Sequence, residues 1–138
     1  DFDPIEEVGA IVGSSIIELI PSQTSMVQWV MERTQYLSKE TCGKCVPCRV
    51  GVKRIEGILE GIVSGLGIDG DLAVLDEFAQ YVPNGSLCGY GINAVNPLKT
   101  VKRYWPDEFQ LYIDEKRAPF GPIIPVRAHR FVTKHVLT

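Results

Sequence analysis

The four cysteines of this chain are the residues whose type and spacing most clearly indicate chemistry. Cys42, Cys45 and Cys48 are separated by two residues each, and Cys88 lies much further along the chain. Two intervening residues let one short turn direct three sulfurs toward a common point, and folding can deliver a distant fourth thiol. The pattern therefore predicts a metal centre, and it favours an iron–sulfur cluster.

Other uses of four cysteines fit the spacing less well. Zinc sites usually present two separate Cys-x-x-Cys pairs, whereas three of these thiols share one segment. A redox dithiol would use one pair and leave two cysteines unexplained. We expect a cytoplasmic chain, either free or peripheral to a membrane complex on the cytoplasmic side, and disulfides are rare in that compartment. A zinc-stabilised helical interaction module without redox function remains the alternative.

Hydrophobic periodicity predicts the helices that must position these thiols. A first helix runs from about Ser22 to Leu37, and a second has Pro47 in its first turn. A third begins at Asp69 or Asp71 and stops at Pro83-Asn84-Gly85, and a fourth begins after Asn96-Pro97 and is kinked or divided at Pro106. The second has the clearest apolar face, which consists of Val52, Ile55, Leu59, Ile62 and Leu66.

The predicted fold is mainly α, a four-helix bundle over residues 22–116 that carries the iron–sulfur cluster. The second and third helices should run antiparallel, so the loop with Cys88 returns to the start of the second helix, where the other three thiols lie. Residues 1–21 are predicted as a short N-terminal β segment, with strands near residues 10–12 and 16–20. Residues 117–138 are predicted as an extended C-terminal tail, because they contain several prolines.

Composition excludes some partners. The 138 residues include 14 basic and 17 acidic side chains, a net charge of −3, which gives no strong attraction for nucleic acid. No stretch approaches the roughly 20 apolar residues that span a bilayer, so direct membrane insertion is not expected. Glu56, Glu60 and Glu108 are predicted to lie on solvated helix faces.

Two segments, residues 40–51 and 86–97, resemble the signatures of a known family. The first reads Glu-Thr-Cys-Gly-Lys-Cys-Val-Pro-Cys-Arg-Val-Gly, and the second Ser-Leu-Cys-Gly-Tyr-Gly-Ile-Asn-Ala-Val-Asn-Pro. They are similar to stretches of the NADH-binding flavoprotein subunit of respiratory complex I and its relatives in NAD(P)-linked hydrogenases and formate dehydrogenases. Where this family has Ser and Leu, the chain has Thr41 and Tyr90.

The resemblance implies both a cofactor and partners. It implies that Cys42, Cys45, Cys48 and Cys88 hold a [4Fe-4S] cluster, which relays electrons from FMN to further iron–sulfur centres. It also implies that residues 1–21 end a β-grasp domain and that residues 22–116 form the C-terminal helical bundle. The partners would be a flavin- and NADH-binding domain or subunit and the other iron–sulfur subunits of a complex.

The nucleotide-binding part of that family is not expected within these residues. The chain contains no Gly-x-Gly-x-x-Gly sequence, so no phosphate-binding loop is predicted. We expect FMN and NAD(P)H on a partner domain or chain, and we expect this chain not to be catalytic alone. It is either a fragment of the larger subunit or a split subunit within an NAD(P)H-linked oxidoreductase.

Overall fold

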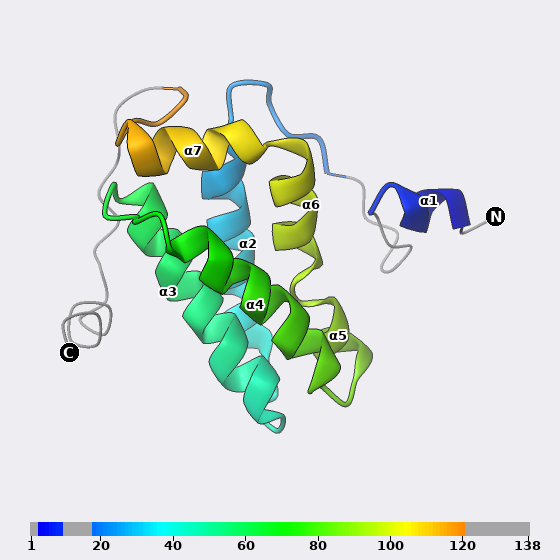
Figure 1. The fold of residues 1–138 in the computed structure, drawn as a ribbon. Helices are drawn as coiled ribbons and strands as arrows, with labels where there is room; N and C mark the ends of the chain where they lie inside the picture. Colours follow the sequence, from blue (N-terminus) through cyan, green and yellow to red (C-terminus); the bar gives the residue numbers. More distant parts are fainter. Residues whose placement is uncertain (1–2, 10–17, 121–138) are drawn as a thin grey trace, which may run out of the picture.

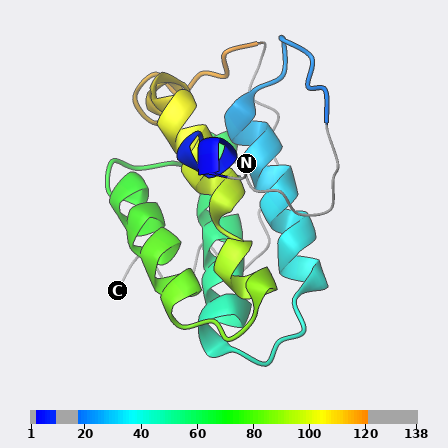
Figure 2. The same ribbon diagram turned by 90° about the vertical axis from the view of Figure 1, so that its right-hand side faces the viewer.

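The computed structural model describes residues 3–9 and 18–120, and within these ranges it is a helical bundle without strands. Figure 1 shows α2, α3, α4 and α6 packed side by side, with α7 lying across one end of the bundle. The quarter-turn view in Figure 2 shows the same packing. The mainly α fold predicted from the sequence is confirmed.

The first bundle helix, α2 (Met26–Glu40), begins slightly later than predicted. Ser25 is its N-cap, with extended backbone, and its hydroxyl accepts a hydrogen bond from the Gln28 amide at 3.1 Å. This bond satisfies one of the amides that a helix start leaves without a partner. Val27 and Val30 then point into the core with no exposed surface.

The predicted second helix consists of two parts. A π-helical turn, η1 (Pro47–Gly51), leads directly into α3 (Val52–Val63). Pro47 occupies the first turn, as predicted, where its missing amide proton removes no hydrogen bond. Gly65, with φ of +76°, follows the end of α3. Leu66 therefore lies outside the helix and is exposed, so its predicted place on the apolar face is wrong.

The remaining helices complete the bundle. The third predicted helix is α4 (Asp71–Asn84), which includes Pro83 and ends within the predicted stop at Pro83-Asn84-Gly85. A short helix that was not predicted, α5 (Gly89–Asn93), follows it. The predicted division at Pro106 is confirmed, because α6 (Asn96–Tyr104) and α7 (Pro106–Asp114) are separated at Trp105, which has non-helical backbone angles.

The core lies between these helices. Apolar side chains at helical spacing fill it, as the periodicity predicted. The fully buried members include Val27 and Val30 of α2, Ile55, Leu59 and Ile62 of α3, Leu75 and Val82 of α4, Leu98 and Val101 of α6, and Phe109 and Tyr112 of α7.

Three glutamates are buried inside this bundle, although we predicted them on solvated faces. Glu60 accepts a hydrogen bond from the Gln35 side chain at 2.9 Å, and Glu56 pairs with Lys53 at 2.7 Å. Glu108 of α7 accepts hydrogen bonds from the Ser25 hydroxyl and, at 3.1 Å, from the Val27 amide. The prediction is wrong because each carboxylate has a hydrogen-bonding partner that offsets its loss of water.

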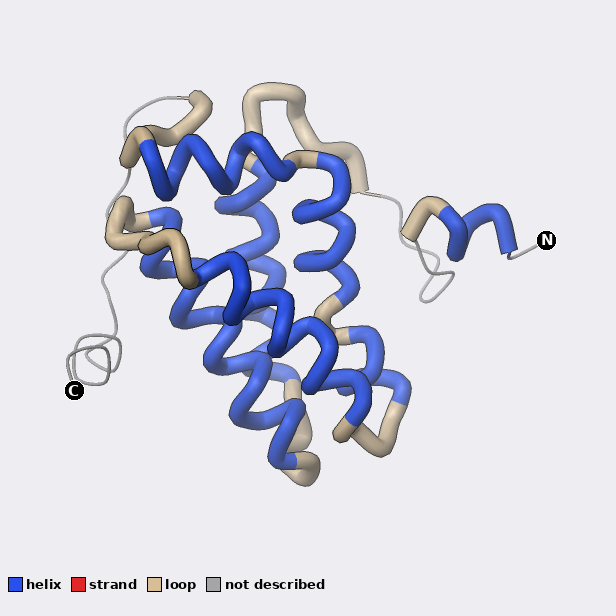
Figure 3. The backbone as a smooth tube through the Cα atoms, in the orientation of Figure 1, coloured by secondary structure: helices blue, strands red, loops and turns tan. Residues whose placement is uncertain are grey.

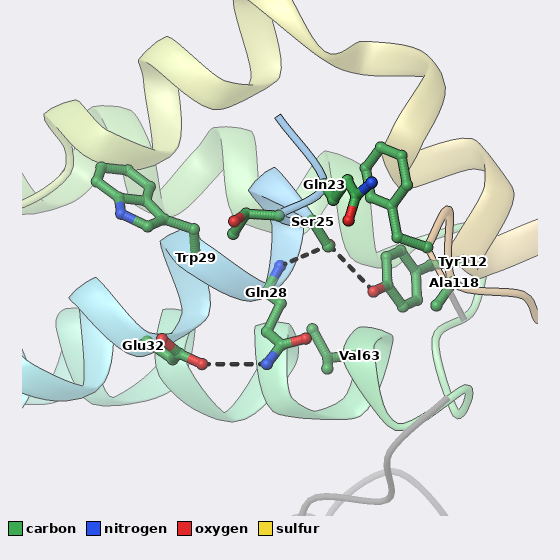
Figure 4. A pocket seen from close by; sticks show the side chains of 10 residues that line it. Gln23, Ser25, Gln28, Trp29, Glu32, Val63, Tyr112 and Ala118 are labelled. Carbon is green, nitrogen blue, oxygen red and sulfur yellow. Dashed lines mark hydrogen bonds between the residues drawn. The ribbon is translucent and has the colours of Figure 1, made fainter. Parts of the chain in front are cut away.

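The Ser25 hydroxyl joins α7 to the start of α2. Tyr112 of α7 lies with its hydroxyl 3.1 Å from the Ser25 hydroxyl, as the close view in Figure 4 shows. Burial raises the pKa of Tyr112, so its hydroxyl remains a neutral hydrogen-bonding group. Together with Glu108, these contacts fix the end of the bundle farther from the cysteines.

The first described residues of the predicted N-terminal β segment form a helix, so the β prediction is wrong for them. Asp3–Glu7 forms α1, in which Pro4 and the acidic Asp3 and Glu6 favour a helix N-terminus. It is attached to α6 through its following turn, where the Tyr104 hydroxyl donates to the Val8 carbonyl at 2.8 Å. The strand predicted at residues 10–12 and the first residues of the one at 16–20 lie outside the described residues, and residues 18–20 are not a strand. Most of the predicted tail, from residue 121, also lies outside them.

Candidate metal centre

All four cysteines lie at the same end of the bundle. Figure 3 shows the loop between α2 and η1 beside the loop between α4 and α5, at the end opposite α7. The first loop contains Cys42 and Cys45, η1 contains Cys48, and Cys88 immediately precedes α5. The four thiols line one cavity of about 260 Å³. The structure thus brings together the four residues that the sequence predicted as ligands.

The turn that carries the first three thiols is held by its own backbone. Gly43 adopts φ of +76°, a left-handed conformation that strains most other residues. The Arg49 amide donates to the Cys45 carbonyl at 2.9 Å, and the Arg49 guanidinium donates to the Gly43 carbonyl. Arg49 therefore closes the turn and also places a positive charge beside the thiols.

Cys48 is the most enclosed thiol. Its exposed fraction is 5%, whereas Cys42 and Cys88 are exposed and Cys45 is intermediate. The Thr41 hydroxyl lies 3.3 Å from the Cys48 sulfur and also accepts a hydrogen bond from the Gly43 amide at 3.3 Å. The Gly43 amide bonds to a lone pair of the Thr41 oxygen, so the Thr41 hydroxyl proton remains free to point at the Cys48 sulfur.

Glycines allow the neighbouring helices to approach this turn. A Cβ atom on Gly51 would lie 2.4 Å from Val82 of α4, and one on Gly85 would lie 2.4 Å from Pro47. On the other side, a Cβ atom on Gly91 would lie 2.6 Å from Ser86. These distances are too short for a real carbon contact, so the close packing of α4 against η1, and of α5 against the turn at Ser86, depends on glycine.

The segment with Cys88 is fixed at both ends. Cys88 has extended backbone, and its carbonyl accepts the Ile92 amide at 3.1 Å, the first turn of α5. The Ser86 hydroxyl donates to the Val82 carbonyl of α4 at 2.6 Å. Tyr90 of α5 reaches α2, where its hydroxyl donates to the Leu37 carbonyl at 2.6 Å.

Tyr90 and Thr41 are parts of the site that reasoning from spacing did not identify. Both line the cavity together with the thiols. Burial raises the pKa of Tyr90 to about 12, with a smaller contribution from negative charge at Cys48. The only sequence signal for either residue was its departure from the family signature, Ser to Thr and Leu to Tyr.

The donor set and the space suit an iron–sulfur cluster. The cavity is many times larger than the roughly 30 Å³ share of one water molecule in the liquid. In the described part of the chain, no three His, Cys, Asp or Glu side chains converge as they would around a single metal ion. Four cysteine sulfurs lining one cavity are a donor set that an iron–sulfur cluster uses.

Comparison with known proteins decides the family. The family described as the NADH-ubiquinone oxidoreductase-F iron-sulfur binding region matches residues 28–112, more than half of the chain. The chain belongs to this family. The matched region contains all four cysteines and ends within α7, so it corresponds to the helical bundle of this iron–sulfur binding region.

Curated relatives agree with this assignment. The chain is 32% identical over 120 residues to the NADH-quinone oxidoreductase F 2 subunit of Rhizobium meliloti (strain 1021), covering 87% of this chain and 28% of the relative. It is 30% identical over 119 residues to NADP-reducing hydrogenase subunit HndC of Solidesulfovibrio fructosivorans, covering 86% of this chain and 24% of the relative. This iron–sulfur binding region therefore spans about a quarter of the length of these relatives.

A solved structure shares the fold. It is a crystal structure of an NAD+-reducing [NiFe]-hydrogenase in the H2-reduced state, with a TM-score of 0.66 and 26% sequence identity. The match covers 69% of this chain and 17% of the hydrogenase chain. Among the described residues, no helix is both long and apolar enough to cross a membrane.

Proposed function

We propose that this chain is an electron-transfer module in which Cys42, Cys45, Cys48 and Cys88 hold one [4Fe-4S] cluster. The observation that carries this proposal is the single cavity lined by all four thiols. A [4Fe-4S] cluster supplies one-electron redox chemistry when it is bound. The names of the relatives support a place in an NAD(P)H-linked oxidoreductase complex.

The chain's own residues prepare the site in three ways. The turn containing Gly43 directs three thiols to the cavity, and α5 delivers the fourth. Lys44 and Arg49 add positive charge beside the thiols, which would reduce the electrostatic repulsion between neighbouring thiolates. The burial of Cys48 and the Thr41 hydroxyl 3.3 Å from its sulfur set the polarity around one ligand.

We also propose the partners. A flavin on another domain or chain would supply electrons, and further iron–sulfur centres of the complex would accept them, so that catalysis belongs to the assembly. FMN and NAD(P)H would bind on that partner. Residues 1–21 would form the end of a β-grasp domain, residues 22–116 the cluster-binding bundle and residues 117–138 an extended tail. A reducing, cytoplasmic compartment would keep the thiols available for iron.

Metal analysis tests the proposal. The chain is purified without oxygen and analysed for iron, acid-labile sulfide and zinc, and EPR spectra are recorded at low temperature after reduction by dithionite. We expect about four irons and four sulfides per chain and a reduced-cluster signal. One zinc per chain without such a signal would instead establish the zinc-stabilised module.

Cys88 provides the sharper test, because its assignment rests on folding and not on motif spacing. We expect Cys88→Ser to lose the cluster as severely as Cys45→Ser, since either variant leaves three thiolates for four iron sites. Iron content and the EPR spectrum of both variants are compared with the wild type. Full iron and an unchanged spectrum in Cys88→Ser would show that Cys88 is not a ligand.

A further inference from the structure

Tyr90 joins the two segments that enclose the cysteine cavity. It lies in α5, two residues after Cys88, and its side chain lines the cavity. Its hydroxyl donates a 2.6 Å hydrogen bond to the Leu37 carbonyl of α2, across a separation of 53 residues. The leucine that the family signature places at this position has no group that could form this bond.

The acceptor of this bond, the Leu37 carbonyl, lies at the end of a helix and is available to a partner from another segment. Leu37 lies in the last turn of α2, where helix carbonyls have no partner within the helix. Four residues later the chain reaches Thr41 and then Cys42, so this end of α2 sets where the first thiol segment begins. A bond from Tyr90 to Leu37 therefore fixes the Cys88 segment relative to the Cys42 segment.

The backbone around Tyr90 limits other ways of fixing this segment. Cys88 and Gly89 are exposed, and no side chain of either residue packs into the core. Gly91 is buried beside Ser86 and Cys48, but it has no side chain that could contact them. The Tyr90 side chain thus makes a long-range hydrogen bond between α5 and α2 beside the fourth thiol.

We propose that Tyr90 is a positioning residue that latches the Cys88 segment onto the end of α2 and so holds the fourth thiol beside the other three. This inference rests on the proposed function, because the latch is proposed to retain a cluster. The tyrosine ring, 36% exposed, covers part of the cavity, and the hydroxyl holds the ring in place. Loss of the hydroxyl should leave the fold intact and let the segment open more often.

Iron release measures this opening. The full chain and its Tyr90→Phe and Tyr90→Leu variants are loaded with the cluster without oxygen and mixed with the Fe(II) chelator bathophenanthroline disulfonate. We expect Tyr90→Phe to release iron about fivefold faster, the factor by which one neutral hydrogen bond shifts an opening equilibrium. Tyr90→Leu, which also lacks the ring, should release it faster still.

Tyr81→Phe is the matched control, because Tyr81 is an exposed tyrosine of α4 that does not line the cavity. It should release iron at the wild-type rate. Tyr90→Phe should lower the unfolding free energy of the metal-free chain by no more than this same fivefold factor, about 1 kcal/mol, because only one hydrogen bond of the closed state is lost. A broadened EPR spectrum of Tyr90→Phe would independently report altered positioning of the fourth ligand.

The outcomes distinguish the latch from the function on which it rests. Equal iron-release rates in wild type and Tyr90→Phe would overturn the latch while leaving the cluster assignment intact. A loss of unfolding free energy well beyond that fivefold factor, in parallel with loss of the cluster, would also overturn it, in favour of a general stabilising role. A wild-type chain that takes up zinc but no cluster would overturn the proposed function itself.

Discussion

Thr41 should tune the reduction potential of the proposed cluster. Its hydroxyl lies 3.3 Å from the sulfur of Cys48, the most enclosed of the four thiols. A cluster ligand is a thiolate, which can only accept, so in the loaded site Thr41 must be the donor of this bond. Reduction adds negative charge to the sulfurs, which strengthens the bond and stabilises the reduced state. Removing the hydroxyl should therefore lower the potential.

The size of the effect follows from the charge on the acceptor. A hydrogen bond to a charged group contributes about 1.5–3 kcal/mol. If one added electron is shared among four thiolates, the bond strengthens by about a quarter of that, ~0.6 kcal/mol. For a one-electron couple this corresponds to about 25 mV. Thr41→Val keeps the branched shape of threonine and removes only the donor, so the predicted change is a potential about 25 mV lower.

An EPR-monitored redox titration of the loaded chain provides the measurement. Thr41→Ser is the control, because it keeps the hydroxyl and is the residue of the family signature, and its potential should stay near that of the wild type. A Thr41→Val potential equal to or above the wild-type value would refute the reasoning. Equal shifts in Thr41→Val and Thr41→Ser would also refute it, because packing of the methyl group would then be the cause.

Two stability predictions follow from the packing, and urea unfolding of the metal-free chain checks both. Gly51→Ala should destabilise the chain by about 1–3 kcal/mol, because the added carbon would lie 2.4 Å from Val82. Gly61→Ala, in α3 with open space around it, should instead be neutral or stabilise by up to about 1 kcal/mol; equal losses would contradict this reasoning. Glu108→Ala should cost about 1–3 kcal/mol, because it leaves the buried Val27 amide without its acceptor. A change no larger than that of exposed Asp107→Ala would show that Glu108 contributes little.

The sequence predicted those parts of the fold that depend on local pattern. The apolar residues of α3 face the core because their spacing matches the helical period, and Pro106 divides the last helix because proline cannot continue one from Tyr104. The spacing of the first three cysteines likewise predicted one turn. Each of these features is determined by residues within a few positions of one another.

Features that depend on distant partners could not be predicted in this way. Glu60 and Glu108 look like surface residues until folding brings Gln35 and Ser25 to them. The helix α5 contains two glycines and is too short to show a periodic pattern. The π-helical turn at Cys48 differs from an α-helix only in which carbonyl each amide selects, a choice that side-chain periodicity does not reveal.

The candidate site depends on this distant packing more than its motif suggests. Cysteine spacing arranges three thiols, but the fourth reaches them only if α4 packs directly against η1 and α5 packs against the turn at Ser86. That approach requires the absence of side chains at Gly51, Gly85 and Gly91, where an added carbon would meet a neighbouring atom at 2.4–2.6 Å. These glycines therefore matter to the site as much as the cysteines do, because they determine whether Cys88 can reach the other three thiols. A chain with all four cysteines but bulkier residues at these positions should form the turn without completing the site.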